Sequence, residues 1–167
     1  MIEIKEYEEK YADEISEIVI RNLLEVNVQD YGKEFSKKQA KEFTVDKIRE
    51  VLKTREKVYV ALSNNNVIGT AGMTKSWYND DGEYWILTVF VKPEKQGQGI
   101  GRFLIEHIEE YARKINAKKL VIPASITACE FYHKLGYEYK NCKKELNDEK
   151  MYIMEKLMWQ IDINKTY

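Results

Sequence analysis

The spacing of apolar positions in the first third of the chain predicts one strand and two helices. Apolar and polar residues alternate over residues 2–5, which is typical of a short strand with one covered face. A long helix is predicted over residues 12–29, where buried positions recur at intervals of three and four: Ile15, Ile18, Val19, Asn22, Leu23 and Val26. A second, more polar helix is predicted over residues 36–54. It would form a partly exposed flap whose buried side carries Phe43, Ile48, Val51 and Leu52.

Three strands that form a meander are predicted next. Residues 58–62 and 67–73 flank a polar turn at residues 63–66, and its asparagines tolerate the left-handed backbone that a hairpin needs. A second turn at residues 79–82 leads to a strand over residues 84–91, which is apolar almost throughout. A strand without polar alternation is typical of a sheet position that is covered on both faces.

The second half of the chain predicts alternating helices and strands. A helix is expected over residues 102–115, a strand over 119–122, a helix that carries Tyr132, and two final strands around residues 137–143 and 151–158. No repeat, linker or low-complexity tract interrupts this order. We therefore expect residues 1–167 to form a single α/β domain.

Composition and charge narrow the classes of function. The chain is 44% hydrophobic and 33% charged, with a formal net charge of −1 and no basic field, so nucleic-acid binding is not expected. The N-terminus shows no leader in which basic residues are followed by an apolar stretch. No apolar run approaches the roughly 20 residues that span a bilayer. We expect a cytoplasmic protein with no membrane partner. Two cysteines and two histidines without ligand spacing predict no metal site.

The segment from Val89 to Gly101 is the most informative for function. It predicts the end of a buried strand, a stop at Pro93, a glycine-rich turn and the start of a helix near Arg102. Glycines allow close approach of a ligand, and the free N–H groups of a first helical turn favour an anion. The turn lacks the Gly-Lys-Ser/Thr of a P-loop, and its late position and G-x-G-x-G spacing argue against a dinucleotide fingerprint. A merely structural strand-to-helix turn is the alternative.

Two motifs of this chain resemble those of the GNAT superfamily of acyl-CoA-dependent N-acetyltransferases. The first is the Q-x-x-G-x-G loop over residues 96–101, and the second is A-x-x-x-Y over residues 128–132, followed by Lys-Leu-Gly-Tyr over residues 134–137. The resemblance covers roughly residues 57–158. It implies a GNAT-like α/β (α+β) fold with a mixed, mostly antiparallel twisted sheet of about seven strands, about four helices and a splayed central strand.

The resemblance implies acetyl-CoA as the donor. In the family, the splayed strand pairs with the pantetheine amides, and the glycine-rich loop binds the pyrophosphate. Ser125 stands where the family often has an asparagine that binds CoA. The positions that correspond to cofactor binding are Val89, Phe90, Val91, Gln96, Gly97, Gln98, Gly99, Ile100, Gly101, Arg102 and Ser125.

The catalytic residues are expected from the same resemblance. Tyr132 corresponds to the tyrosine that protonates the departing CoA thiolate, which suits a phenol with a pKa of about 10, although a core tyrosine is the alternative. Some relatives place a glutamate base early in the central strand, where this chain has Trp85. Glu83, two residues earlier on the same strand face, is the candidate base through a water. A solvated carboxylate at Glu83, with proton loss to bulk solvent, is the alternative.

For the pocket that binds the acceptor substrate, the sequence predicts only the regions of the chain that form it. Glu25 and Tyr31 at the end of the first helix, together with Trp77, Tyr84 and Trp85, are expected to line it, although core packing would also explain the aromatic residues. We predict an N-acetyltransferase that transfers acetyl from acetyl-CoA to a primary amine of a small molecule or peptide. A non-catalytic acyl-CoA-binding regulatory module is the alternative. The apolar strand expected over residues 151–158, with Trp159 after it, would supply an edge or face for a homodimer.

Overall fold

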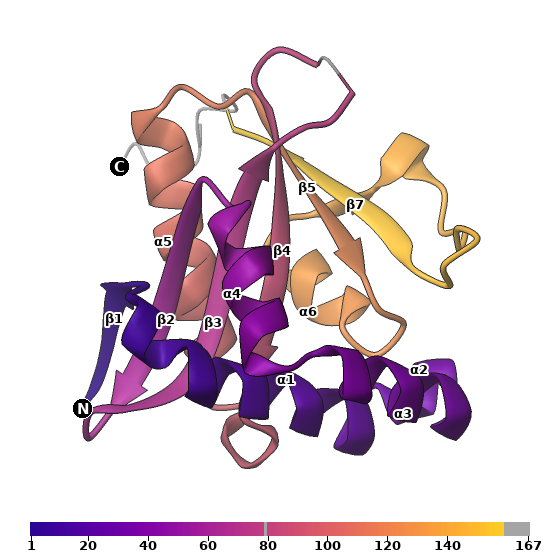
Figure 1. Ribbon diagram of the computed structural model, residues 1–167. Coiled ribbons are helices and arrows are strands. Elements are labelled where there is room, and N and C mark those ends of the chain that lie inside the picture. Colours follow the sequence, from indigo (N-terminus) through magenta and orange to yellow (C-terminus); the bar gives the residue numbers. More distant parts are fainter. Residues whose placement is uncertain (79, 159–167) are drawn as a thin grey trace.

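A seven-stranded sheet with helices on both faces forms the protein, as the computed structural model shows for residues 1–78 and 80–158 (Figure 1). The strand order is β1-β2-β3-β4-β5-β7-β6, and all neighbours are antiparallel except β4 and β5. This confirms the predicted mixed, mostly antiparallel α/β fold. The strands are β1 (Ile2–Glu6), β2 (Lys57–Ser63), β3 (Asn66–Lys75), β4 (Glu83–Val91), β5 (Lys119–Ala124), β6 (Glu138–Tyr139) and β7 (Tyr152–Leu157).

The helices are more numerous than predicted because both helices expected before β2 are broken. The first ends at Glu25 instead of residue 29, and the second is interrupted at Phe43. Thr44 then starts a new helix, since its hydroxyl accepts a hydrogen bond from the Lys47 N–H at 3.2 Å. The helices are α1 (Ala12–Glu25), α2 (Val28–Tyr31), α3 (Lys33–Glu42), α4 (Val45–Lys53), α5 (Ile100–Lys114) and α6 (Cys129–Lys134), with short 3₁₀ turns η1 (Glu9–Tyr11), η2 (Pro93–Lys95) and η3 (Lys140–Cys142).

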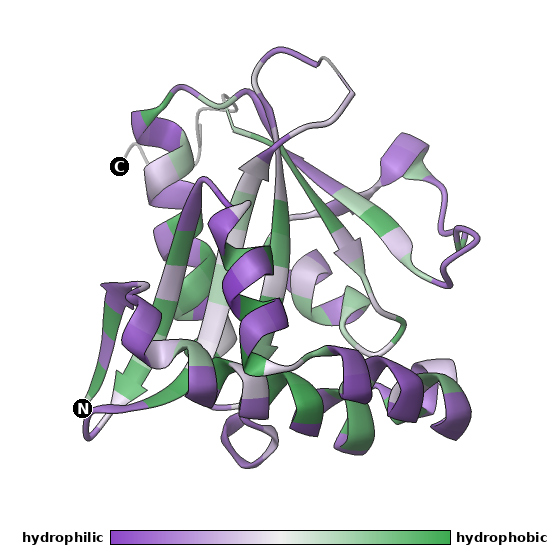
Figure 2. Ribbon diagram, viewed as in Figure 1, coloured by the Kyte–Doolittle hydropathy of each residue, from purple (hydrophilic) through white to green (hydrophobic). Residues whose placement is uncertain are grey.

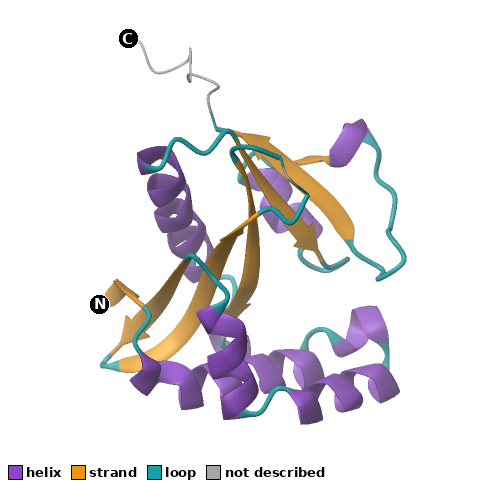
Figure 3. Cartoon of the chain, turned by 45° about the horizontal axis from the view of Figure 1, so that its top comes forward, coloured by secondary structure: helices purple, strands orange, loops and turns teal. Residues whose placement is uncertain are grey.

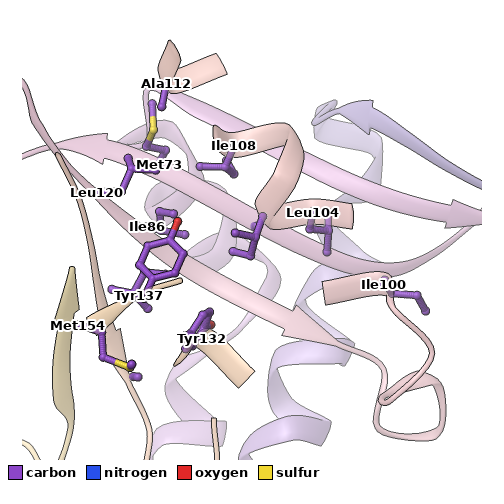
Figure 4. Close-up of a cluster of buried hydrophobic side chains, with 14 of the residues drawn as sticks. Met73, Ile86, Ile100, Leu104, Ile108, Ala112, Leu120, Tyr132, Tyr137 and Met154 are labelled. Atoms are coloured by element: carbon purple, nitrogen blue, oxygen red, sulfur yellow. The ribbon is translucent and has the colours of Figure 1, made fainter. Parts of the chain in front are cut away.

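Two hydrophobic cores lie on opposite faces of the sheet. In β2, Val58 and Val60 pack with α1 and α4, whereas Ala61 packs on the face that α5 covers. α4 buries Ile48 and Leu52, so it is more than a flap, whereas α3 is mostly hydrophilic (Figure 2). The α5-side core includes Met73, Ile86, Ile100, Leu104, Ile108, Ala112, Leu120, Tyr132, Tyr137 and Met154 (Figure 4).

β4 contains a bulge that the sequence pattern does not predict. Thr88 has a φ of 58°, and the register with β3 shifts between Thr70 and Gly72. Ile86 and Val89 therefore both pack in the α5-side core although they are three residues apart. A positive φ is rare for a β-branched residue and costs about 1–3 kcal/mol, so the surrounding structure must hold Thr88 in place.

β4 and β5 diverge after a short paired segment (Figure 3). Only residues 83–85 of β4 pair with β5, through residues 119–121. From Ile86 onward, β4 has no partner on this side among the strands described. The splay that the family resemblance implies is therefore present, and it opens toward the ends of both strands.

The final strands differ from the prediction in length and position. Residues 140–142 form a 3₁₀ turn, so β6 has only two residues, and it pairs with Met154 and Glu155 of β7. β7 lies between β5 and β6, so it is not an edge strand. Trp159 lies outside the described residues, and a homodimer through this region stays a prediction. Within residues 1–78 and 80–158, no helix combines the length and apolar character needed to cross a membrane.

Candidate active site

A cleft of about 690 Å³ opens where β4 and β5 diverge. Its walls come from the second half of β4, the end of β5, the loop before α5, α6, and the end of α1 with α2. Most predicted donor-side residues meet there, together with one acceptor-side residue. The predicted residues that line it are Tyr31, Val89, Phe90, Val91, Gln96, Gly97, Gly99, Ile100, Gly101, Arg102, Ser125 and Tyr132.

Other lining residues were not predicted from the sequence. Lys95 directly precedes the first motif and Lys134 belongs to the second, so their positions were an available signal. Leu87 and Thr88 also line the cleft, at the bulge of β4, for which the sequence carries no signal. The remaining additional residues are Asn22, Leu23, Val26, Asn27, Ile86, Ile122, Pro123, Thr127, Ala128, Phe131, Leu135 and Met151.

The loop between β4 and α5 presents a series of free backbone amides. Gly97 and Gly99 have φ values of 74° and 82°, and an added Cβ at either would meet nothing within 4 Å. Backbone conformation, and not space, therefore requires glycine at both positions. At Gly101, in contrast, a Cβ would lie 3.0 Å from Cζ of Phe131. The N–H groups of residues 97–102 have no acceptor among the described residues, and the first to bond is that of Phe103, to the Gly99 carbonyl.

A buried amide ties this loop to α1. Asn22 is 4% exposed, and its Nδ2 donates to the carbonyls of Ile18 at 2.8 Å and Val91 at 2.9 Å. Its Oδ1 accepts a hydrogen bond from Nε2 of Gln96 at 2.9 Å. The same Gln96 nitrogen lies 3.2 Å from the Val91 carbonyl. Asn22 therefore fixes the end of β4 and the start of the loop relative to α1.

The charged side chains that line the cleft are all positive among the described residues. Lys95, Arg102 and Lys134 line it, and no aspartate, glutamate or histidine does so among the described residues. The whole protein has a formal net charge of −1, so this is a local concentration of positive charge. Such a cleft attracts a ligand that carries several negative charges.

Tyr132 lines the cleft with a side chain that is only 6% exposed. Its ring packs edge-on against Phe131, with centroids 5.0 Å apart, and against Tyr137, with centroids 6.2 Å apart. Figure 4 shows Tyr132 and Tyr137 within the α5-side core. Burial raises the pKa of the Tyr132 hydroxyl above the ordinary value of 10. The hydroxyl has no hydrogen-bond acceptor within the described part of the chain. The site therefore holds a neutral phenol whose O–H is free to donate.

Glu83 does not reach the cleft, so the expectation that it acts as a base through a water needs correction. Its Oε2 pairs with Nζ of Lys119 at 2.8 Å, and its Oε1 accepts from Trp85 Nε1 and Ser76 Oγ, each at 2.9 Å. Burial alone would raise the pKa of Glu83, but these hydrogen bonds outweigh it and lower the pKa to about 2. A carboxylate with that pKa and three partners is a poor proton acceptor.

Several acceptor-side expectations also lie away from the cleft. Trp77 is 62% exposed and packs against Trp85 at a centroid distance of 5.5 Å, whereas Tyr84 packs against the α5-side core. Glu25 is an exposed partner of Arg21, at 3.0 Å. On the donor side, the Gln98 side chain points away and donates to the Glu94 carbonyl at 3.2 Å.

Tyr31 is the acceptor-side residue that does line the cleft. It belongs to α2, which is joined to the opposite wall because Asp30 accepts hydrogen bonds from the N–H and the hydroxyl of Thr127. Burial, followed by the charges of Asp30 and Glu149, raises the pKa of Tyr31. Across the described residues, no group of three or more His, Cys, Asp or Glu side chains is arranged to hold a metal ion.

The part of the sequence that forms this cleft identifies the protein family. Residues 20–137 match the acetyltransferase (GNAT) family, and this match spans most of the chain. The protein belongs to the GNAT family and is an acetyltransferase. The resemblance seen in the two motifs is thereby confirmed.

Solved structures share the fold over nearly the whole chain. PaiA N-acetyltransferase from Thermoplasma acidophilum, solved in complex with coenzyme A, has a TM-score of 0.79 at 18% identity, covering 94% of this chain and 99% of that one. A GCN5-related N-acetyltransferase from Rhodopseudomonas palustris has a TM-score of 0.77 at 22% identity, covering 93% and 94%. YncA from Salmonella typhimurium, solved with its cofactor acetyl-CoA, has a TM-score of 0.67 at 18% identity, covering 95% and 94%. A comparison with curated protein sequences gives no match.

Proposed function

We propose that the protein binds acetyl-CoA in the cleft and transfers its acetyl group to a primary amine. The observation that carries the proposal is the combination, in one cleft, of an open strand edge, a run of unbonded loop amides and three basic side chains. Each part matches a part of the donor: pantetheine amides, a pyrophosphate and further negative charge. The presence of coenzyme A or acetyl-CoA in two of the structures with this fold supports the choice of donor.

The donor's phosphates would lie at the start of α5. The N–H groups of residues 97–102 point their positive ends at this position, and the dipole of α5 adds to them. Lys95, Arg102 and Lys134 would neutralise the remaining phosphate charge. Because the Val91 carbonyl already accepts from Asn22 and Gln96, pantetheine pairing would fall mainly on Val89, which shares the same edge of β4.

The chemistry requires an amine to attack the thioester carbon and the carbon–sulfur bond to break. An N–H group on the open edge of β4 would stabilise the negative charge that forms on the carbonyl oxygen. Tyr132 would donate its hydroxyl hydrogen to the departing sulfur. Because burial keeps this phenol neutral, the donor is present throughout the physiological pH range.

In this mechanism, no carboxylate of the cleft accepts the proton of the amine. No aspartate, glutamate or histidine lines the described walls, and Glu83 is held by Lys119 outside them. The amine would therefore enter neutral or lose its proton to water. In this mechanism the protein contributes by positioning the two reactants and by supplying the acid.

The test is Tyr132→Phe, assayed with an amine found by screening acetyl-CoA consumption over small amines and peptides. Turnover should fall about 100-fold, because general acid catalysis contributes that much or more, while the Kd for acetyl-CoA changes little. Tyr59→Phe is the matched control, since Tyr59 packs against the α5-side core and does not line the cleft. Unchanged turnover in Tyr132→Phe would remove this residue from the mechanism. Tight acetyl-CoA binding without turnover of any amine would instead favour the acyl-CoA-binding module.

A further inference from the structure

Arg55 reaches the cleft region from the face of the sheet opposite α5. It follows α4, and its side-chain methylenes cover Gly72, where an added Cβ would lie 3.2 Å from Arg55 Cγ. Its Nε and Nη2 each lie 3.3 Å from Thr88 Oγ1, and its Nη1 donates to Thr54 Oγ1 at 2.8 Å. Since Thr88 lines the cleft, only one hydroxyl separates the guanidinium from it.

The charge of Arg55 has no counter-ion in the described part of the chain. Arg21, Arg49 and Arg113 each pair with a carboxylate within 4.0 Å, and Arg102 lines the donor part of the cleft. Arg55 is half-buried, has no such pair, and its burial lowers its pKa. A partly buried cation without a partner is costly, so pairing with an anionic ligand would stabilise Arg55.

The hydrogen bonds of Arg55 also leave capacity for an anion. A guanidinium has five N–H donors in a fixed fork that matches a carboxylate. Here two of them share a single hydroxyl oxygen at 3.3 Å, which is long for a charge-assisted bond, and the second N–H of each terminal nitrogen is unused by the described residues.

Arg55 lies on the face of the sheet from which the acceptor amine would enter the cleft. Gly72 pairs with Leu87, and Leu87 lines the cleft on the face that Arg55 covers. Tyr132 and Val89 instead belong to the α5-side core. A donor held beside Tyr132 leaves the Arg55 face for the acceptor.

We propose that Arg55 binds a carboxylate of the acceptor, so that the preferred acceptor is a primary amine that also carries a carboxylate. This inference rests on the proposed function and specifies its substrate class. An amino acid is the simplest such compound. The competing explanation is that Arg55 only holds Thr88 in its left-handed conformation.

The first experiment compares amino acids with their carboxamides, which keep the amine and lose the negative charge. Wild-type protein should acetylate the acid with a kcat/KM about 10- to 100-fold above that of the amide. Arg55→Gln should remove most of this preference by raising KM for the acid alone, and Arg55→Lys should retain part of it. Lys53→Gln is the matched control, because it removes an exposed charge at the end of α4, two residues before Arg55. Equal rates for acid and amide in the wild type, or an equal loss for both in Arg55→Gln, would overturn the proposal.

The second experiment does not depend on turnover and separates this inference from the proposed function. N-acetylglycine and the neutral N-acetylglycinamide are titrated into the CoA-loaded protein by calorimetry. Saturable binding of N-acetylglycine alone, weakened about tenfold or more in Arg55→Gln, supports the anion site even if no acetylation is found. Equal binding of both probes, or binding of neither, counts against it.

Discussion

Glu83 and Tyr132 are both buried ionisable residues, and their surroundings shift their pKa values in opposite senses. Hydrogen bonds from Lys119, Trp85 and Ser76 lower the pKa of Glu83 against the effect of burial, whereas burial among apolar side chains raises that of Tyr132. One residue is thereby kept as a carboxylate and the other as a neutral acid. Their roles follow: Glu83 joins β4 to β5, and Tyr132 is available for chemistry.

The contribution of Glu83 to stability should depend on pH. Its pKa of about 2 in the folded protein lies below the ordinary 4.5, so its stabilising effect is full above pH 4.5 and is lost as the pH falls toward 2. Glu83→Gln should lower the free energy of unfolding by about 2 kcal/mol at pH 7 and by clearly less at pH 3. Urea unfolding at both pH values measures this. Asp81→Asn, at an exposed partner of Lys118, should change stability little at either pH. An equal loss for Glu83→Gln at both pH values would mean that its charge is not the cause.

At the scale of elements, the sequence predicts the first five strands and the loop well, because these depend on local pattern, whereas residues 140–142 of the predicted sixth strand form a 3₁₀ turn. The continuous apolar run of β4 indicates a central strand, and the glycines of residues 97–101 indicate a turn before a helix. The division of residues 36–54 by Thr44 could have been predicted too, since threonine is a preferred N-cap.

The rest of the site depends on contacts that no local pattern encodes. Asn22 has the spacing of a core residue, yet its amide fixes the loop at Gln96. The bulge at Thr88 and the approach of Arg55 to it depend on the register between β3 and β4. The position of Glu83 also depends on a contact between strands. Strand alternation predicts which face of the sheet its side chain lies on, but not that Lys119 on the neighbouring strand binds it.

The glycine-rich loop allows a test of backbone conformation. Gly99→Ala places a Cβ in open space but requires a φ near 82°, so we expect about 1 kcal/mol of lost stability and a clearly higher Kd for acetyl-CoA. Gly136→Ala is the matched control, because Gly136 has a φ of 91° and does not line the cleft. It should lose similar stability and keep its acetyl-CoA affinity. Thermal unfolding and calorimetric titration measure both quantities, and an unchanged Kd in Gly99→Ala would exclude the loop from donor binding.

At the scale of the whole molecule, the sheet consists of two parts that meet over a short segment. β1 to β4 form one part and β5 to β7 the other, and strand pairing joins them only at residues 83–85 and 119–121. Asp30 and Thr127 add a second connection on the far side of the cleft. A ligand that contacts both walls would bind the folded protein and not the unfolded chain.

Acetyl-CoA should therefore raise the melting temperature. A ligand at a hundredfold excess over its Kd stabilises the folded state by about 2.7 kcal/mol, which corresponds to roughly 5–10 °C for a domain of this size. Coenzyme A without its 3′-phosphate should produce a smaller shift at the same concentration, because it leaves part of the positive charge of Lys95, Arg102 and Lys134 unpaired. Differential scanning calorimetry measures the shift. Its absence at millimolar acetyl-CoA would contradict the donor site.

The extra residue at Thr88 divides β4 into two half-strands of opposite phase. Before it, Leu87 faces Arg55, and after it, Val89 and Val91 face the α5-side core. A substitution at Leu87 would thus change the Arg55 side of the cleft without touching Val89 or Val91, where we propose that the donor binds. With donor and acceptor placed as we propose, a single irregular residue would allow substitutions to change acceptor preference while the donor positions stay intact.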